Sequence, residues 1–130
     1  KPIVLHAVYD DAPAVCDLLE KYGVKRAHFH WFKGDPRTIA RMAENGWYVS
    51  LTPDVSYEAE IRDLAARYPI GQIMAETDGP WPFEGKYAGR MTRPAMVRDV
   101  VAEIAAIKGL PVEEAAEIIY ASTRKFYRLD

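Results

Sequence analysis

The sequence has one cysteine, little net charge and no long hydrophobic run, and each of these shortages excludes a class of protein. Cys16 has no partner for an intramolecular disulfide, so we expect it to be a small core residue of a protein in a reducing compartment, the cytoplasm. The 17 basic and 19 acidic residues give a net charge of −2, which excludes a general attraction to nucleic acid or to a membrane surface. No apolar run approaches the roughly 20 residues that cross a bilayer, so we expect no membrane partner.

The pattern of short apolar runs predicts a single α/β domain over residues 1–130. No low-complexity segment or linker divides the chain. Runs rich in apolar and β-branched residues predict strands at residues 2–7, 26–31, 47–52 and 70–77. Asp35-Pro36 is expected to begin a helix and Thr92 to cap another. Caps, glycines and apolar stripes predict helices at about residues 11–22, 36–45, 56–68, 93–108 and 111–126.

Polar side chains recur at the ends of these strands every 22 to 26 residues: His6, His30, Thr52 and Asp78. A strand–helix unit of that length, repeated four times, is typical of a parallel βα fold. A complete eight-unit barrel needs about 250 residues. The sequence therefore predicts a (βα)4 half of a TIM barrel, with parallel strands and helices on the outer face.

The stretch MAETDGP, residues 74–80, carries the most informative polar residues. Carboxylates that end a parallel strand point into the crevice where α/β folds place their chemistry, so Asp78 is a candidate catalytic residue. Strand alternation directs His6, His30 and Asp78 to the same rim. Two imidazoles and a carboxylate suit a divalent metal such as zinc, although histidines bonded within the core would explain the spacing as well.

Other polar and aromatic residues near this rim allow two readings. We expect His28 and Glu76 to lie one layer deeper, where Arg26 would pair with Glu76 and a structural role is favoured. The aromatic residues of the nearby loops suit stacking on a base or sugar, or simple packing at the rim: Trp31, Phe32, Trp81 and Phe83. The loop cations suit phosphate contact or plain solvation: Lys33, Lys86, Arg90 and Arg93.

The motifs PIVLHA, HFHWFKG, MAETDGPWPF, GRMTRP and STRKFYRL, in this order, resemble the second half of the TatD family of metal-dependent hydrolases. The family belongs to the amidohydrolase-like metal barrels. The resemblance implies a TIM barrel that uses zinc, manganese or magnesium to hydrolyse phosphodiester bonds, often as a deoxyribonuclease. It implies that His6, His30 and Asp78 are the metal ligands of the family's fifth, sixth and eighth strands.

The chain departs from the family pattern at several positions. Thr92 and Arg93 stand where asparagine and glutamate are usual, and Ser122 stands where an asparagine is common. The family's first-strand His-x-His pair and fourth-strand glutamate have no counterpart in this sequence. The resemblance therefore implies a single three-ligand site of weaker affinity in place of a two-metal site.

An isolated half-barrel would leave the edges of its first and fourth strands unpaired. We therefore expect a two-fold homodimer, in which each first strand pairs with the fourth strand of the other copy, or a complementary half-barrel. Three functions remain open. The chain is a hydrolase acting on nucleic acid or another phosphodiester, a silent structural half-barrel, or another amidohydrolase-like esterase. As substrate contacts of the hydrolase we expect Trp31, Lys33, Trp81 and Arg90.

Overall fold

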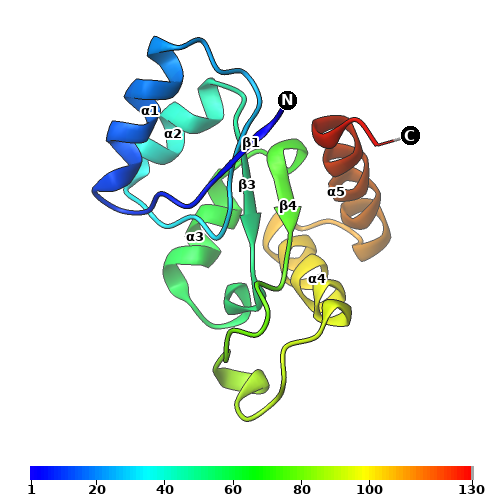
Figure 1. Ribbon diagram of the computed structural model, residues 1–130. Helices are drawn as coiled ribbons and strands as arrows, with labels where there is room; N and C mark the ends of the chain where they lie inside the picture. The colour runs from blue at the N-terminus through cyan, green and yellow to red at the C-terminus, as the bar shows by residue number, and fades with distance from the viewer. Residues whose placement is uncertain (130) are drawn as a thin grey trace.

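Four parallel strands and five α-helices make up the computed structural model, which describes residues 1–129 (Figure 1). The strands follow one another across the sheet in the order β1-β2-β3-β4, as consecutive βα units require. The predicted parallel α/β fold is thereby confirmed. The elements are β1 (Ile3–Leu5), α1 (Asp11–Lys21), β2 (Ala27–Phe29), α2 (Pro36–Glu44), β3 (Tyr48–Leu51), α3 (Ala59–Arg67), β4 (Ile73–Ala75), α4 (Val97–Lys108) and α5 (Val112–Tyr127).

Local chemistry explains where two of the helices begin and end. Asp35 is the N-cap of α2, because its carboxylate accepts from the amide N–H groups of Arg37 and Thr38, and Pro36 occupies the first helical position. The hydrogen bond from the Thr38 hydroxyl, together with these two amide bonds, holds the pKa of the Asp35 carboxyl below its usual range. Gly109 ends α4 with a φ of 66°, a left-handed conformation that glycine adopts without strain.

The strands are shorter than predicted, and three boundaries are wrong for reasons that the structure shows. Residues 53–56 form a short 3₁₀-helix, so α3 begins at Ala59. Residues 70–72 also form a 3₁₀ turn, in which the Gln72 N–H donates to the Pro69 carbonyl, so β4 begins at Ile73. Thr92 does not cap α4, because its hydroxyl donates to the Trp81 carbonyl and a 3₁₀ turn over Pro94–Met96 precedes the helix.

The main core lies between one face of the sheet and the helices. Side chains that point to this face are fully or almost fully buried: Ala27, Phe29, Val49, Leu51 and Ile73. Residues of the helices pack against them, among them Cys16, Met42, Leu64 and Ile104. Cys16 is buried and free, as predicted, and burial raises the pKa of its thiol. Among the helices of residues 1–129, none combines the length and the hydropathy needed to cross a bilayer.

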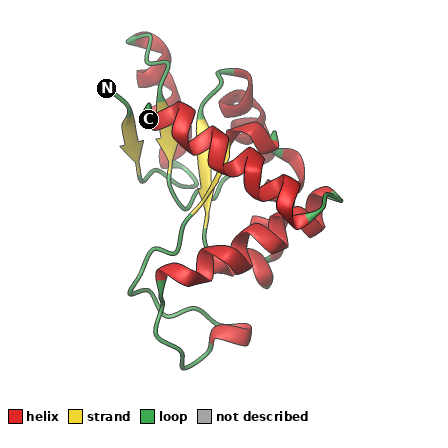
Figure 2. Ribbon diagram, turned by 90° about the vertical axis from the view of Figure 1, so that its right-hand side faces the viewer, coloured by secondary structure: helices red, strands yellow, loops and turns green. Residues whose placement is uncertain are grey.

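The opposite face of the sheet is the inner face, and the last turn of α5 covers part of it. Figure 2 shows this helix crossing the sheet on its way to the C-terminus. The Phe126 ring lies 4.7 Å from the ring of Tyr48, and the Tyr127 hydroxyl lies 2.7 Å from His28 Nδ1. Tyr48 and His28 are register partners and therefore share this face. The expectation that all helices lie on the outer face is wrong for this turn, because the buried Phe126 ring and the half-buried Tyr127 side chain contact the inner face.

Candidate metal centre

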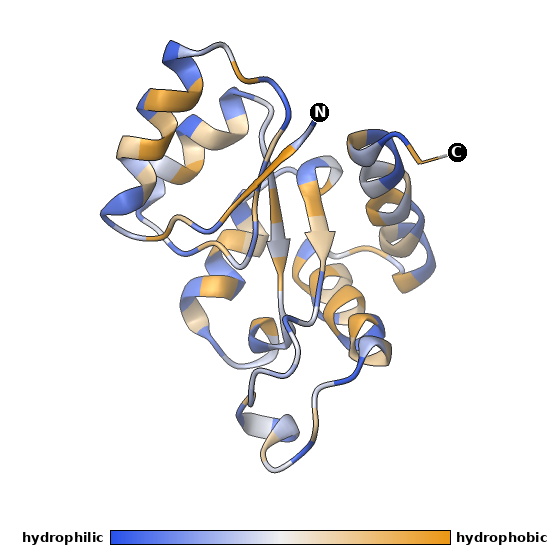
Figure 3. Ribbon diagram, viewed as in Figure 1, coloured by the Kyte–Doolittle hydropathy of each residue, from blue (hydrophilic) through white to orange (hydrophobic). Residues whose placement is uncertain are grey.

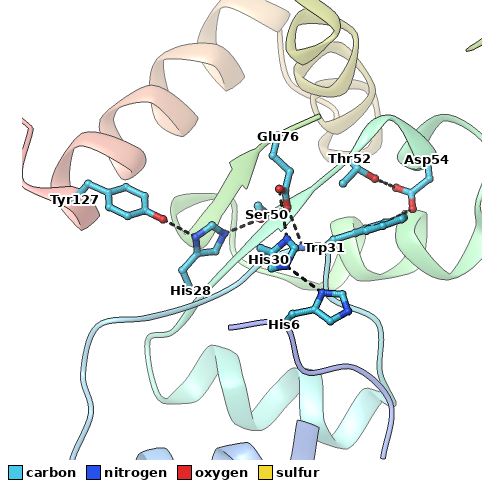
Figure 4. Close-up of polar contacts among 9 residues, drawn as sticks. All are labelled: His6, His28, His30, Trp31, Ser50, Thr52, Asp54, Glu76 and Tyr127. Carbon is cyan, nitrogen blue, oxygen red and sulfur yellow. Dashed lines mark hydrogen bonds and ion pairs between the residues drawn. The ribbon is translucent and has the colours of Figure 1, made fainter. Parts of the chain in front are cut away.

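His6 and His30 lie side by side because their strands are parallel and in register. Each histidine directly follows its strand, and the last register pair joins Leu5 to Phe29. The ladder continues by one bond, since the His30 amide N–H donates to the Leu5 carbonyl at 3.0 Å. The two imidazoles consequently face each other (Figure 4), with His6 Nδ1 3.0 Å from His30 Nε2.

This separation suits two ligands of one metal ion. Imidazole nitrogens bind zinc at about 2.0–2.1 Å, so two of them stand about 2.9 Å apart at a right angle and about 3.3 Å apart at a tetrahedral angle. The 3.0 Å between His6 Nδ1 and His30 Nε2 falls within this range. Without a metal, the same distance lets one ring donate a hydrogen bond to the other. The nitrogen donors of this pair therefore fit a divalent metal.

Two carboxylates from the end of β4 approach His30. Glu76 directly follows the strand, and its amide N–H donates to the Leu51 carbonyl at 2.9 Å. Asp78 lies two residues further along, at a φ of 44°, in a turn in which the Trp81 N–H donates to the Asp78 carbonyl at 3.1 Å. One potential ligand atom from each of His30, Glu76 and Asp78 lies within 4.8 Å of the others. Nitrogen and oxygen atoms that can bind a metal therefore converge where the strands end.

Two of the three predicted ligands, His30 and Asp78, belong to this group. The third, His6, lies outside the group but contacts His30. The third member of the group is Glu76, which the sequence analysis assigned to a deeper structural layer. His6 is exposed, whereas the side chains of His30 and Glu76 retain 25% and 23% of their exposure. The half-buried pair thus forms the inner part of the centre and His6 its outer part.

The expected ion pair between Arg26 and Glu76 is absent, and this prediction is wrong. Glu76 Oε1 accepts hydrogen bonds from the amide N–H of Trp31, at 2.9 Å, and from the Ser50 hydroxyl. The Arg26 guanidinium donates to the Phe126 carbonyl in the last turn of α5. Arg26 precedes β2 and Glu76 follows β4, so the two side chains lie at opposite ends of the sheet.

His28 is buried on the inner face and connects Ser50 to α5. Its Nε2 lies 2.7 Å from Ser50 Oγ and its Nδ1 2.7 Å from the Tyr127 hydroxyl. Burial, with a smaller effect of nearby His30, lowers the pKa of His28 to about 4, so the ring is neutral near pH 7. Because the Ser50 proton is donated to the Glu76 carboxylate, Ser50 Oγ accepts from His28 Nε2–H. Nδ1 of the neutral ring then accepts a hydrogen bond from the Tyr127 hydroxyl. Tyr127 thus donates to His28, His28 to Ser50, and Ser50 to Glu76.

Trp31 and Trp81 line a pocket beside the centre. Their ring centroids lie 4.9 Å apart, and Lys33 Nζ lies 5.7 Å from the Trp31 ring. The pocket has a volume of about 170 Å³. It is also lined by Asp54, Tyr57, Glu58, Pro82 and Glu84. The structure therefore brings together three of the four predicted substrate contacts, Trp31, Lys33 and Trp81.

Arg90, the fourth predicted substrate contact, does not line this pocket. Its guanidinium lies 5.9 Å from the ring centroid of Tyr87, and it borders a different hollow with Met91, Arg93 and Met96. Lys86, another candidate for phosphate contact, pairs with Glu103 at 3.4 Å.

Asp54 holds the Trp31 side chain and is not among the predicted site residues. Trp31 has a φ of 45°, a strained backbone conformation for a bulky residue. Its indole Nε1–H donates to Asp54 Oδ2 at 2.6 Å, and its backbone N–H donates to Glu76. Asp54 is buried and also accepts from the Thr52 hydroxyl at 2.6 Å. Its position in the sequence, two residues after Thr52 at the end of the third predicted strand, could have indicated Asp54 as a site residue.

Known proteins match this chain over nearly its whole length. A family model described as TatD related DNase matches residues 1–128. An uncharacterized metal-dependent hydrolase of Haemophilus influenzae is 33% identical over 128 residues, which are 98% of this chain and 50% of that protein. A human protein named deoxyribonuclease TATDN3 is 25% identical, over 97% of this chain and 45% of its own length.

About half of the solved structure of a TatD homologue from Escherichia coli has the fold of this chain. The TM-score is 0.88 at 20% identity, over 99% of this chain and 51% of that one. The chain thus spans about half the length of the curated relatives it matches. Since the family model covers residues 1–128, the chain belongs to the TatD-related DNase family.

Proposed function

We propose that this chain holds a metal centre of a hydrolase that cleaves phosphodiester bonds in the manner of a deoxyribonuclease. The observation that carries the proposal is the 3.0 Å approach of His6 Nδ1 to His30 Nε2, beside the carboxylates of Glu76 and Asp78. Relatives named metal-dependent hydrolases, and a human relative named a deoxyribonuclease, support it.

His6, His30 and Asp78 would hold the ion. When bound, a divalent metal such as zinc, manganese or magnesium makes water more acidic and polarises a phosphoryl oxygen. Asp78, in its tight turn at the rim, is the candidate to orient the attacking water and to accept its proton. The water oxygen then bonds to phosphorus as the bond to the leaving oxygen breaks.

The pocket beside the centre would bind the substrate next to the reacting phosphate. Trp31 and Trp81 would offer aromatic surface to a base or sugar, and Lys33 a positive charge to a phosphate. A volume of about 170 Å³ has room for one ring system. We also propose Arg90, which lies outside this pocket, as a phosphate contact. The lone buried thiol of Cys16 suits a reducing compartment, and we propose the cytoplasm.

The proposal is tested with the chain stripped by a chelator and then reloaded with zinc, manganese or magnesium. We expect the reloaded chain to hydrolyse bis-p-nitrophenyl phosphate and a fluorescent DNA oligonucleotide, and the stripped chain to do neither. Tight metal binding with no turnover of either substrate would indicate a silent half-barrel. Turnover of p-nitrophenyl acetate alone would indicate a carboxylic esterase.

We propose as well that a second copy of the chain covers β1 and closes the sheet towards a barrel. Ile3 and Val4 are 40% and 51% exposed, and Figure 3 colours β1 as strongly hydrophobic. An exposed apolar edge strand favours pairing with another strand. In this closure, β4 of each copy would pair with β1 of the other copy.

Light scattering at micromolar concentration tests this arrangement. We expect a dimer for the unmodified chain and a monomer for Val4→Lys, because a charge on the inner face of β1 disfavours burial there. Leu18→Lys is the matched control, since Leu18 is 53% exposed on α1 and its change should leave the dimer intact. A monomeric mass for the unmodified chain would contradict the dimer.

A further inference from the structure

We propose that Glu76 is a positioning residue that fixes the proton position on the His30 imidazole and so directs His30 Nε2 to the metal. The inference rests on the proposed metal centre. Glu76 belongs by distance to the group of potential ligands, yet its carboxylate is already engaged by other groups of the chain. The hydrogen bonds of the Glu76 carboxylate therefore decide between a role as a metal ligand and a role as a partner of His30.

The first oxygen of the carboxylate is saturated by donors. Glu76 Oε1 accepts from the Trp31 backbone N–H and from the Ser50 hydroxyl. Ser50 in turn accepts from His28, which the Tyr127 hydroxyl contacts from α5. Figure 4 shows these side chains in a continuous chain across the inner face of the sheet. Glu76, which follows β4, is thus held by Trp31 after β2, by Ser50 of β3 and, through Ser50 and His28, by Tyr127 of α5, which leaves its carboxylate little freedom to turn.

The second oxygen faces His30. Glu76 Oε2 lies 3.6 Å from His30 Nδ1, an ion-pair distance that exceeds hydrogen-bond range. A small turn of the ring would close this contact, and contacts of functional residues are commonly longer in an unloaded protein. A carboxylate can only accept, so it favours the His30 tautomer that carries its proton on Nδ1.

This tautomer leaves the lone pair of His30 on Nε2, the atom that faces His6. A carboxylate behind a metal-binding histidine commonly sets its tautomer and orientation in this way. Glu76 thereby acts through His30. The same carboxylate accepts a hydrogen bond from the backbone N–H of Trp31, the residue that follows His30. The strained conformation of Trp31 and the direction of His30 are coupled through one side chain.

Glu76→Gln is the sharpest test, because the side chain keeps its size but gains an NH₂ group. With its amide oxygen taken by Ser50 and Trp31, the NH₂ group faces His30 Nδ1 and should move the His30 proton to Nε2. Long-range ¹⁵N–¹H spectra of the metal-free chain report the tautomer directly. We expect the Nδ1–H form in the unmodified chain, the Nε2–H form in Glu76→Gln, and a mixture in Glu76→Ala.

Metal affinity provides the second readout. We expect zinc binding, measured by calorimetry, to weaken roughly 10–100-fold in Glu76→Gln, the usual effect of losing such an outer partner. Ser50→Ala should weaken it less, since the Trp31 bond to Glu76 remains. Asp63→Asn is the matched control, because it removes one negative charge from an exposed ion pair on α3 and should change neither readout.

The two readouts separate the possible failures. An unchanged His30 tautomer in both Glu76 variants, each shown to be folded by circular dichroism, would overturn the positioning role. Weaker zinc binding with that unchanged tautomer would mean that Glu76 is a direct ligand. If the unmodified chain binds no metal, the proposed function fails, whereas the tautomer spectra still decide whether Glu76 orients His30.

Discussion

Replacing His30 with alanine is expected to weaken zinc binding by at least about 100-fold, because even the loss of an outer partner of a ligand costs roughly 10–100-fold. His30 is the only residue that both faces His6 Nδ1 and belongs to the group with Glu76 and Asp78, among the residues that the structure describes. Calorimetry with the stripped chain measures the effect. The same variant should lose metal-dependent hydrolysis.

Two controls make this result specific. Tyr22→Ala changes a side chain that is 71% exposed at the end of α1 and should bind zinc like the unmodified chain. Metal-free His30→Ala should remain folded in thermal unfolding with a loss of about 1 kcal/mol, because a side chain that is only 25% exposed loses its contacts to His6 and Glu76. Unaltered zinc affinity in a folded His30→Ala chain would remove the proposed centre.

Phe29→Ala is expected to destabilise the fold by about 3–5 kcal/mol, the usual range for removing a buried phenylalanine. Its ring is fully buried and lies 5.8 Å from Phe32 and 6.0 Å from Trp47, measured between ring centroids. A domain is typically stable by only about 5–15 kcal/mol, so most of the stability could be lost. Urea unfolding followed by tryptophan fluorescence measures the change.

Phe29 lies on the outer face of β2, next in sequence to His28 and His30 on the inner face. Phe29→Leu, which keeps most of the apolar volume, should cost clearly less than Phe29→Ala. Tyr22→Ala should change stability by no more than about 0.5 kcal/mol, as expected for an exposed position. A loss below about 1 kcal/mol for Phe29→Ala would mean that this face of the sheet is not the main core.

Much of the fold could be predicted because the hydrophobic patterns and turn signals are local. The Asp35-Pro36 start of α2 and the Gly109 end of α4 depend on residues next to each helix, and both are found in the structure. The parallel order of the strands follows from their regular spacing. The boundaries of α3 and β4 were missed because 3₁₀ turns, which leave no periodic pattern, precede both elements.

The partners of polar side chains could be predicted less well. Arg26 and Glu76 were matched by charge, but they lie at opposite ends of the sheet and bond to Phe126 and to Ser50 and Trp31. Arg90 lies in the same long loop as Trp81, but its guanidinium contacts the Tyr87 ring and borders a different hollow. Charge and proximity in the sequence do not determine which side chains meet across a loop.

The sequence by itself determined that histidines and carboxylates end parallel strands, because alternation and repeat length are properties of the chain alone. Only the tertiary structure decided that Glu76 joins His30, that Asp54 holds the Trp31 indole, and that Tyr127 reaches His28 from the end of α5. These contacts join residues on different elements, up to 99 positions apart. No local sequence pattern specifies such contacts, because they form only when the sheet and the helices pack together.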